Sequence, residues 1–442
     1  MRQFVVDSIY NYSNVILIGL ILGFVWYAAD LIIRQKEFAL QTLWGQLGQQ
    51  RWLFGQWQTA LRQKAATVLF CVAAAIYQFE VFFINSLYRE RLPWMHEVGT
   101  ILLDHMFELC LLIKILFCSR YSGRHLTVAS GVFFIMRWVF FNNHNSWMIV
   151  SVLFVFAAKD VPLRKALKTC FAVGGASVAV VMASSCTGII RTVFDTETDR
   201  YRNSFGYGWY NYFGACLLGL AIMYICLRRV HRMQWYDFAL LAALAVFSDR
   251  GPDSRSATIC FILLFVGLLI LRIFPQVLEW LPIRILATAS PVLAFALSLL
   301  AASSWNPDSK VITTLNGLLS GRVELSWIWL NQMPFRIAGQ IPHPDMLVDN
   351  AYIQYWIIAG PVASLLVWGA FSLLIWRLLR QQCITEAACA LIMLCHGLME
   401  IHVTWSCINV TIWLLAGVLY WTKQQPSFAP QQDMPIKQKR RT

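Results

Sequence analysis

Apolar runs long enough to cross a membrane recur along almost the whole sequence, and they constrain the fold more than any other feature. A helix of about 20 apolar residues spans a bilayer. Such runs occupy residues 14–33, 66–85, 98–118, 125–141, 146–158, 166–190, 210–227, 235–248, 256–271, 284–302, 351–376, 384–399 and 404–421. The sequence therefore predicts an all-α polytopic integral membrane protein with about 12 or 13 transmembrane helices, forming a single transmembrane domain over residues 1–442. No signal-peptide pattern precedes the first run, so we expect it to remain as a helix.

Lysine and arginine are distributed unevenly between the connecting loops. With the N-terminus placed outside, 24 of the 36 fall on the inner side, 11 on the outer side, and Arg137 lies within a run. This bias follows the positive-inside rule. It accounts for the net charge of +13 without nucleic acid as a partner. We expect residues 34–64 to form an amphipathic cytoplasmic segment on the inner surface, and residues 422–442 to be a disordered basic cytoplasmic tail near anionic membrane lipids.

Polar side chains gather in four segments assigned to the outer face. These segments are 200–214, 248–257, 315–327 and 341–360. The third and most of the fourth belong to a large extracytoplasmic loop, 303–350, and loops of this length are usually functional. The outer basic residues are all arginine except Lys310, and the arginine fork suits bidentate contact with phosphate or carboxylate. We therefore expect this face to bind an anionic substrate.

Two of these segments precede helices. Ser254, Arg255 and Ser256 fall at a helix start, where free backbone N–H groups and the helix dipole favour an anion. A plain capping role for the two serines remains equally open. Asp349 and Asn350 stand before another run, and alone they fit an N-cap better than a binding site. Aromatic residues near them fit an interfacial belt as well as a platform for a sugar; they are Trp209, Tyr210, Tyr212 and Tyr352.

Other polar clusters have simpler explanations. His396, Glu400 and His402 match no zinc spacing, and a polar contact between helices is favoured. The 12 cysteines lie mostly within apolar runs, where they act as small hydrophobic residues. A polar stripe in run 98–118 stays as a secondary candidate, because charges inside a membrane often line a cavity. It comprises Asp104, His105, Glu108 and Lys114.

The order of the outer motifs resembles that of the Wzy-type polysaccharide polymerases and, more distantly, the O-antigen ligases. The resemblance covers roughly residues 190–380. It rests on an arginine followed by a glycine–aromatic–asparagine run, a Ser-Arg-Ser helix start, a Ser-Gly-Arg in the large loop, and an Asp-Asn before a span with a Gly-Pro turn. Here these motifs are Arg202, Gly206 and Asn211; Ser254-Arg255-Ser256; Ser320-Gly321-Arg322; and Asp349-Asn350 with Gly360.

The resemblance implies a GT-C-like fold and a metal-independent glycosyltransferase that needs no cofactor. Such an enzyme joins oligosaccharide repeat units carried on undecaprenyl pyrophosphate at the outer face of a bacterial cytoplasmic membrane, with a possible chain-length regulator as partner. It assigns Arg255, Arg322 and, less directly, Arg202 to the pyrophosphate. Asp349 or His343 becomes the base that takes the proton of the acceptor hydroxyl. The substrate-binding residues are expected to be Asn211, Ser254, Ser256, Asn350 and Tyr352.

Three alternatives to a polymerase remain open at this stage. An O-antigen ligase would transfer the finished chain to another acceptor, but ligases carry a histidine where this chain has Asp349. A polysaccharide flippase would show two related halves and binding residues at the midplane, and the sequence has no such halves. A membrane protein that binds sugars without catalysis would tolerate substitution of Asp349.

Overall fold

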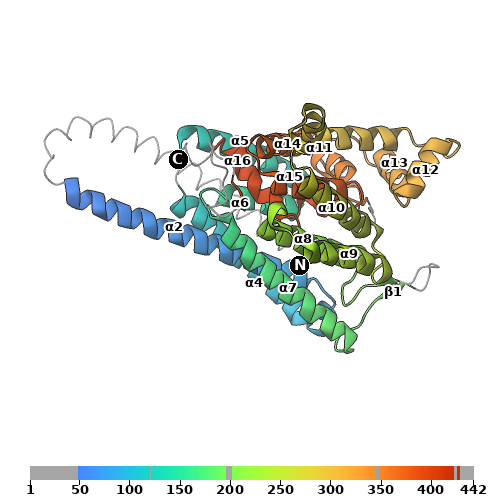
Figure 1. Cartoon of the computed structure of the whole chain (residues 1–442), viewed down its shortest axis with the longest axis horizontal. Coiled ribbons are helices and arrows are strands. Elements are labelled where there is room, and N and C mark those ends of the chain that lie inside the picture. The colour runs from blue at the N-terminus through green and yellow to red at the C-terminus, as the bar shows by residue number, and fades with distance from the viewer. Residues whose placement is uncertain are drawn as a thin grey trace.

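The computed structural model describes residues 48–119, 121–195, 202–343, 346, 348–422 and 426–428. Its regular elements are almost all helices (Figure 1). The α-helices are α2 (Gly48–Phe79), α3 (Tyr88–Arg91), α4 (Thr100–Ile113), α5 (Gly123–Asn143), α6 (Ser146–Ala157), α7 (Leu163–Cys186), α8 (Tyr210–Arg228), α9 (Trp235–Arg250), α10 (Arg255–Ile273), α11 (Leu281–Ser303), α12 (Lys310–Leu318), α13 (Arg322–Gln332), α14 (Ala351–Arg380), α15 (Ile384–His396) and α16 (Leu415–Leu419).

Short irregular elements connect or extend these helices. Three π-helical turns lengthen α2 and flank α4; they are η1 (Glu80–Ile84), η2 (Met95–Gly99) and η3 (Lys114–Cys118). The 3-10 turns are η4 (Val230–Arg232), η5 (Val277–Glu279), η6 (Ile401–Thr404) and η7 (Val410–Leu414). The strands β1 (Phe194–Asp195) and β2 (Arg202–Asn203) pair as a small antiparallel hairpin.

The prediction of an all-α polytopic membrane protein is confirmed. Seven helices among the described residues are long and apolar enough to cross a membrane. They are Leu61–Ile84, Gly123–Asn143, Leu163–Cys186, Tyr210–Arg228, Arg255–Ile273, Leu281–Ser303 and Ala351–Arg380. Two predicted short runs form the shorter helices α6 and α15. Run 404–421 is not one helix, because turns interrupt it around η7 and α16. Run 14–33 lies outside the described residues.

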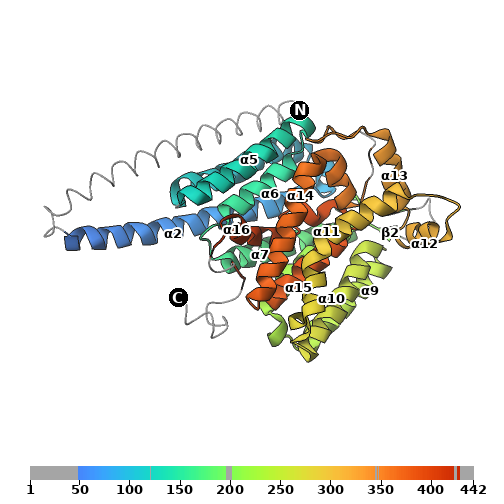
Figure 2. The ribbon, with the colours of Figure 1, turned by 90° about the horizontal axis from the view of Figure 1, so that it is seen from above.

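The helices pack in neighbouring pairs that bring distant parts of the chain together. α11 runs beside α14, α9 beside α10, and α2 beside both α4 and α7. The large loop carries α12 and α13, which lie together at one end of the molecule (Figure 2); we call this end the loop side. Residues 48–64 of the expected amphipathic segment belong to the continuous helix α2, and residues 34–47 lie outside the described residues.

The core is built from aromatic and aliphatic side chains of α2, α6, α8, α14 and α15. Phe70, Phe154 and Trp413 meet at its centre, with ring centroids 5.3 to 6.3 Å apart. The start of the expected C-terminal tail reaches this core, because Phe428 is fully buried and its backbone N–H donates to Glu386 Oε1 at 3.2 Å. Residues 423–425 and 429–442 of that tail lie outside the described residues.

α14 is broken near its start. Gly360 has a φ of 77°, and Pro361 follows it. The carbonyl oxygen of Ile358, which the break leaves without its usual helical partner, accepts from Gln340 N at 3.1 Å and from Asn143 Nδ2 at 3.1 Å. The break therefore ties the end of the large loop and the end of α5 to the outer turns of α14.

Candidate functional site: a buried arginine with two carboxylates

Arg322 is the centre of a buried polar cluster on the loop side. It opens α13 directly after Gly321, whose φ of 83° suits glycine. Its side chain is 10% exposed, and its NH2 group lies 2.9 Å from Glu400 Oε1 and 3.4 Å from Asp349 Oδ2. Its Nε donates to the backbone oxygen of Met399 at 2.6 Å. The guanidinium thus holds two carboxylates from separate segments in one place.

Glu400 is the deeper of the two carboxylates. It follows α15, and its side chain is 4% exposed. Ser256 Oγ donates to Glu400 Oε1 at 2.9 Å, and Ser254 Oγ lies 3.4 Å from Ser256 Oγ. Burial raises the pKa of the Glu400 carboxyl to about 7, and Asp349 adds to the rise, whereas Arg322 and Ser256 oppose it. Near neutral pH this carboxyl is therefore present in both its protonated and its ionised form. We call these five residues (Ser254, Ser256, Arg322, Asp349 and Glu400) the Arg322 cluster.

Asp349 is the accessible carboxylate of the Arg322 cluster. Its side chain is 44% exposed, so water or a ligand can reach it. Burial against the surrounding protein raises its pKa, and Arg322 acts against that rise. The contact with Arg322, at 3.4 Å, is longer than the 2.9 Å contact between Arg322 and Glu400. Asp349 is therefore the carboxylate of the cluster that a ligand can reach from outside the protein.

Asn350 fixes the position of Asp349 because it caps α14. Its Oδ1 accepts from the backbone N–H groups of Tyr352 and Ile353 at 3.0 and 3.2 Å. Its Nδ2 donates to Ser298 Oγ of α11 at 3.1 Å. An asparagine cap satisfies backbone donors at a helix start, so the carboxylate before it is held beside α11 and α14 rather than on a loose loop.

The segment 202–214 packs against the turn that leads into Ser254 of the Arg322 cluster. Gly214 of α8 is required there, because a Cβ atom at this position would lie 2.4 Å from Ser254 Oγ. Arg202 NH2 donates to the backbone oxygen of Asp253 at 3.3 Å and lies 3.5 Å from Asn211 Oδ1. Its guanidinium also covers the ring of Tyr210, 4.5 Å from the centroid. This segment thus fixes the turn that leads into Ser254.

An apolar cavity of about 730 Å³ opens beside Arg322. Its walls are mostly leucine, isoleucine and alanine side chains of α11 and α12, and Arg322, Asn350 and Ser298 add polar groups. Leu297 and Leu300 of α11 are 61% and 60% exposed, so the cavity is open toward the surroundings of this helix. The site therefore combines an apolar surface with a cation, Arg322, on its wall, and this cation is itself held by two carboxylates.

The predicted site residues fall into three groups. Arg322, Asp349, Asn350, Ser254 and Ser256 come together, although the start of α10 is far in sequence from the large loop. Arg202 and Asn211 contact one another beside the turn before α10. Arg255 is exposed at the first residue of α10, and His343 is exposed with its ring 5.7 Å from that of Trp329 on α13.

Tyr352, which was expected to bind substrate, lies inside the protein in this structure. Its side chain is fully buried, its hydroxyl donates to the backbone oxygen of Leu394 at 2.8 Å, and its ring packs on Trp368 with centroids 4.4 Å apart. A tyrosine with its hydroxyl used in this way is a packing residue that joins α14 to α15. The neighbouring Asn350 was predicted correctly as an N-cap, and it also borders the cavity.

The sequence did not single out Glu400 as a member of this site. Its neighbours His396 and His402 predicted a polar contact between helices, and Glu400 makes one with Ser256 and Arg322. The signal that could have found it is an acidic residue at the end of an apolar run on the arginine-bearing face.

In comparisons with known proteins, neither a family model, nor a curated protein, nor a solved structure matches the chain.

Proposed function

We propose that the protein is a Wzy-type polysaccharide polymerase of a bacterial cytoplasmic membrane. It joins oligosaccharide repeat units carried on undecaprenyl pyrophosphate, on the side of the membrane where the large loop lies. The observation that carries this proposal is Arg322, held with two carboxylates at the edge of an apolar cavity of about 730 Å³. This combination suits a substrate with a long apolar tail and an anionic headgroup.

The apolar cavity supports a lipid-linked donor. Its leucine-rich wall along α11 and α12 offers a surface for an isoprenoid chain. The headgroup of such a lipid then lies near Arg322, with Arg255 exposed at the start of α10 on the same side of the molecule. Arginine forks and the N-terminus of a helix both stabilise phosphate oxygens. The charge that develops on a departing pyrophosphate is the main electrostatic demand of the reaction.

The two carboxylates divide the remaining tasks. Asp349, the accessible one, is the base: when the pyrophosphate takes its place beside Arg322, the carboxylate loses its cation and its pKa rises further. The acceptor hydroxyl oxygen then attacks the anomeric carbon, the bond from this carbon to the pyrophosphate oxygen breaks, and Asp349 takes the proton. Glu400, buried at 4% exposure, keeps Arg322 in position. His343, exposed beside Trp329, is the alternative base.

The first experiment gives the purified, reconstituted protein one lipid-pyrophosphate-linked repeat unit and separates the products on a gel. We expect a ladder of lengths from the wild type and none from Arg322→Ala. Asp349→Asn, a change at a half-exposed position, should also abolish the ladder while the protein remains folded. Arg336→Ala is the matched control, because Arg336 is an exposed arginine of the same loop outside the cluster. A wild-type ladder from both site variants would refute the assignment.

The same assay separates the polymerase from its relatives. A ligase uses the same donor and differs in its acceptor, although ligases carry a histidine at the position of Asp349 in the Arg322 cluster. Transfer that requires a second, unrelated lipid acceptor would identify a ligase. Movement of the lipid across a vesicle membrane without any new glycosidic bond would identify a flippase.

A further inference from the structure

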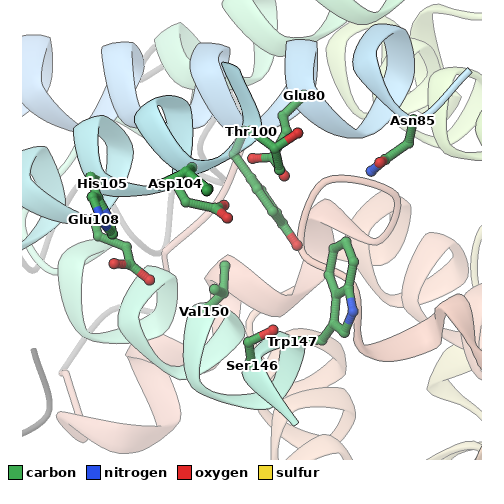
Figure 3. Close-up of a pocket in the computed structure, with 11 residues that line it drawn as sticks. Glu80, Asn85, Thr100, Asp104, His105, Glu108, Ser146, Trp147 and Val150 are labelled. Atoms are coloured by element: carbon green, nitrogen blue, oxygen red, sulfur yellow. The ribbon is translucent and has the colours of Figure 1, made fainter. Parts of the chain in front are cut away.

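A second polar pocket lies away from the Arg322 cluster, between α2, α4 and α6. It has a volume of about 160 Å³, far more than the roughly 10–15 Å³ that one water needs. Three carboxylates line it: Glu80 from the end of α2, and Asp104 and Glu108 from α4. Figure 3 shows Asp104 and Glu108 pointing into the space before the start of α6, which carries Ser146 and Trp147.

Two polar atoms on this pocket lack partners within the described part of the chain. Glu80 is 4% exposed, and its Oε2 has no hydrogen-bond partner there. Tyr77 is 2% exposed, and its hydroxyl has none either. Buried carboxylates are normally paired with a cation or fully hydrogen-bonded, because their desolvation is costly. Glu80 Oε2 and the Tyr77 hydroxyl therefore border a space that could hold a further hydrogen-bond donor.

The lining residues include no lysine or arginine, and His105 is the one lining side chain that could carry a positive charge beside the three carboxylates. Within the described ranges, no three histidine, cysteine or acidic side chains converge closely enough to hold a metal ion. A protonated primary amine meets the requirement better, because it carries one positive charge and three N–H donors that reach separate acceptors. We propose that this pocket binds a protonated primary amine, held by the carboxylates of Glu80, Asp104 and Glu108.

The other lining groups favour an amine attached to a polar body. Asn85, Thr100 and Ser146 offer an amide and two hydroxyls, and Trp147 offers an aromatic ring at the same pocket. Amides, hydroxyls and tryptophan faces are the groups that hold sugars, and they also suit the ethanolamine headgroup of a lipid. An amino sugar and ethanolamine are therefore the two sources of the amine, and they share the same chemistry.

The pocket is connected to the Arg322 cluster by packed rings. Trp147 stacks on Trp405 with centroids 4.2 Å apart and planes at 2°. Trp405 touches the ring of His402 at 4.8 Å, and His402 Nδ1 lies 4.0 Å from Glu400 Oε2. An amine-bearing group in the pocket would thus be separated from the proposed catalytic site by the rings of Trp147, Trp405 and His402. Binding of the amine does not depend on the proposed reaction.

The test is calorimetric titration of the purified full-length protein in detergent, at constant ionic strength and pH 7. The probes are glucosamine and ethanolamine, with glucose, sodium chloride and tetramethylammonium chloride as comparisons. We expect one site for at least one of the two amines, and no comparable heat from the other three. Tighter binding of glucosamine would identify the sugar as the source, and tighter binding of ethanolamine would identify the lipid headgroup.

Two variants connect this binding to the pocket. Asp104→Asn and Glu108→Gln keep the shapes of the side chains, remove one charge each, and should weaken binding of the amine at least tenfold. The matched control is Asp160→Asn, because the Asp160 side chain is 59% exposed and pairs with Lys159 outside the pocket. Size-exclusion chromatography checks that each variant is folded. Failure of both amines to bind the wild type, equal binding of glucose or tetramethylammonium, or unchanged affinity in both variants would overturn the proposal.

Discussion

Replacing Arg322 by methionine tests the electrostatics of the Arg322 cluster most directly. Methionine keeps an unbranched apolar stem but removes the charge and the hydrogen bonds to Met399 and Glu400. Glu400 then remains at 4% exposure with Ser256 as a partner and no adjacent cation. Removing one member of a buried ion pair costs about 3–5 kcal/mol, because the other charge stays desolvated. We expect Arg322→Met to lower the free energy of unfolding toward this range above pH 7, where Glu400 of the wild type is ionised.

A second substitution separates loss of charge pairing from loss of packing. Glu400→Gln removes the stranded charge but keeps an oxygen that accepts from Ser256 Oγ. The double variant Arg322→Met, Glu400→Gln should therefore be more stable than the sum of the two single changes predicts, by about 2 kcal/mol, within the range known for residues in contact. Asp349 contributes less to this coupling, because its side chain is 44% exposed and water screens its charge.

The stability difference between Arg322→Met and the wild type should grow as the pH rises. Burial raises the pKa of Glu400 to about 7 even with Arg322 beside it, and loss of the arginine raises that pKa further. The folded variant therefore holds its proton up to a higher pH, and its stability falls more steeply than that of the wild type as pH rises above 7. At pH 5 the carboxyl is protonated in both proteins, so the difference between them should shrink.

The assay is thermal unfolding of the four purified proteins in one detergent at pH 5, 7 and 8. The electrostatic interpretation fails if the two substitutions are additive within about 0.5 kcal/mol, or if Arg322→Met destabilises the protein equally at pH 5 and pH 8. Either result would mean that Arg322 contributes mainly by packing, and that the Glu400 carboxyl has no strong interaction with its charge.

Two further substitutions test residues next to the site. Gly214→Ala should destabilise the protein and reduce activity, because the added Cβ would lie 2.4 Å from Ser254 Oγ, whereas Gly131→Ala on α5 meets no atom within 4 Å and should be neutral or slightly stabilising in the same thermal measurement. Tyr352→Phe removes the hydrogen bond to Leu394 and should lower the unfolding free energy by about 1 kcal/mol; unchanged polymer length from this variant would agree with a packing role, and loss of polymer would restore Tyr352 to the substrate site.

The transmembrane helices could be predicted because hydrophobic length is a local property. The run 256–271 became α10, Arg255–Ile273, with its polar start where the serines indicated it. For the run 404–421, hydrophobic length did not predict the structure correctly. This run contains apolar stretches, but hydropathy does not register the turns around η7, where Asn409 Nδ2 donates to Val403 O and the Asn409 side chain caps the next turn.

The candidate site could be predicted only in part, because it depends on contacts between distant residues. The sequence indicated that Arg322 and Asp349 belong to polar outer segments, and they do meet. It gave no sign that Glu400 would join them, since Glu400 is 78 residues from Arg322 and 144 from Ser256. The burial of Tyr352 could not be predicted for a related reason: an aromatic side chain at a helix start has the same local pattern whether it faces a ligand or, as here, Trp368.

The break in α14 has a consequence for engineering this protein. Gly339 and Gly360 press against one another's segments so closely that a Cβ atom at either would lie 1.9 or 2.2 Å from a carbonyl oxygen of the other, Ile358 O or Ile337 O. The end of the large loop and the first turns of α14 therefore form one structural unit. A chimera that exchanges the loop alone would separate the two backbone segments that fit together at Gly339 and Gly360. Residues 336–360 should therefore be exchanged together.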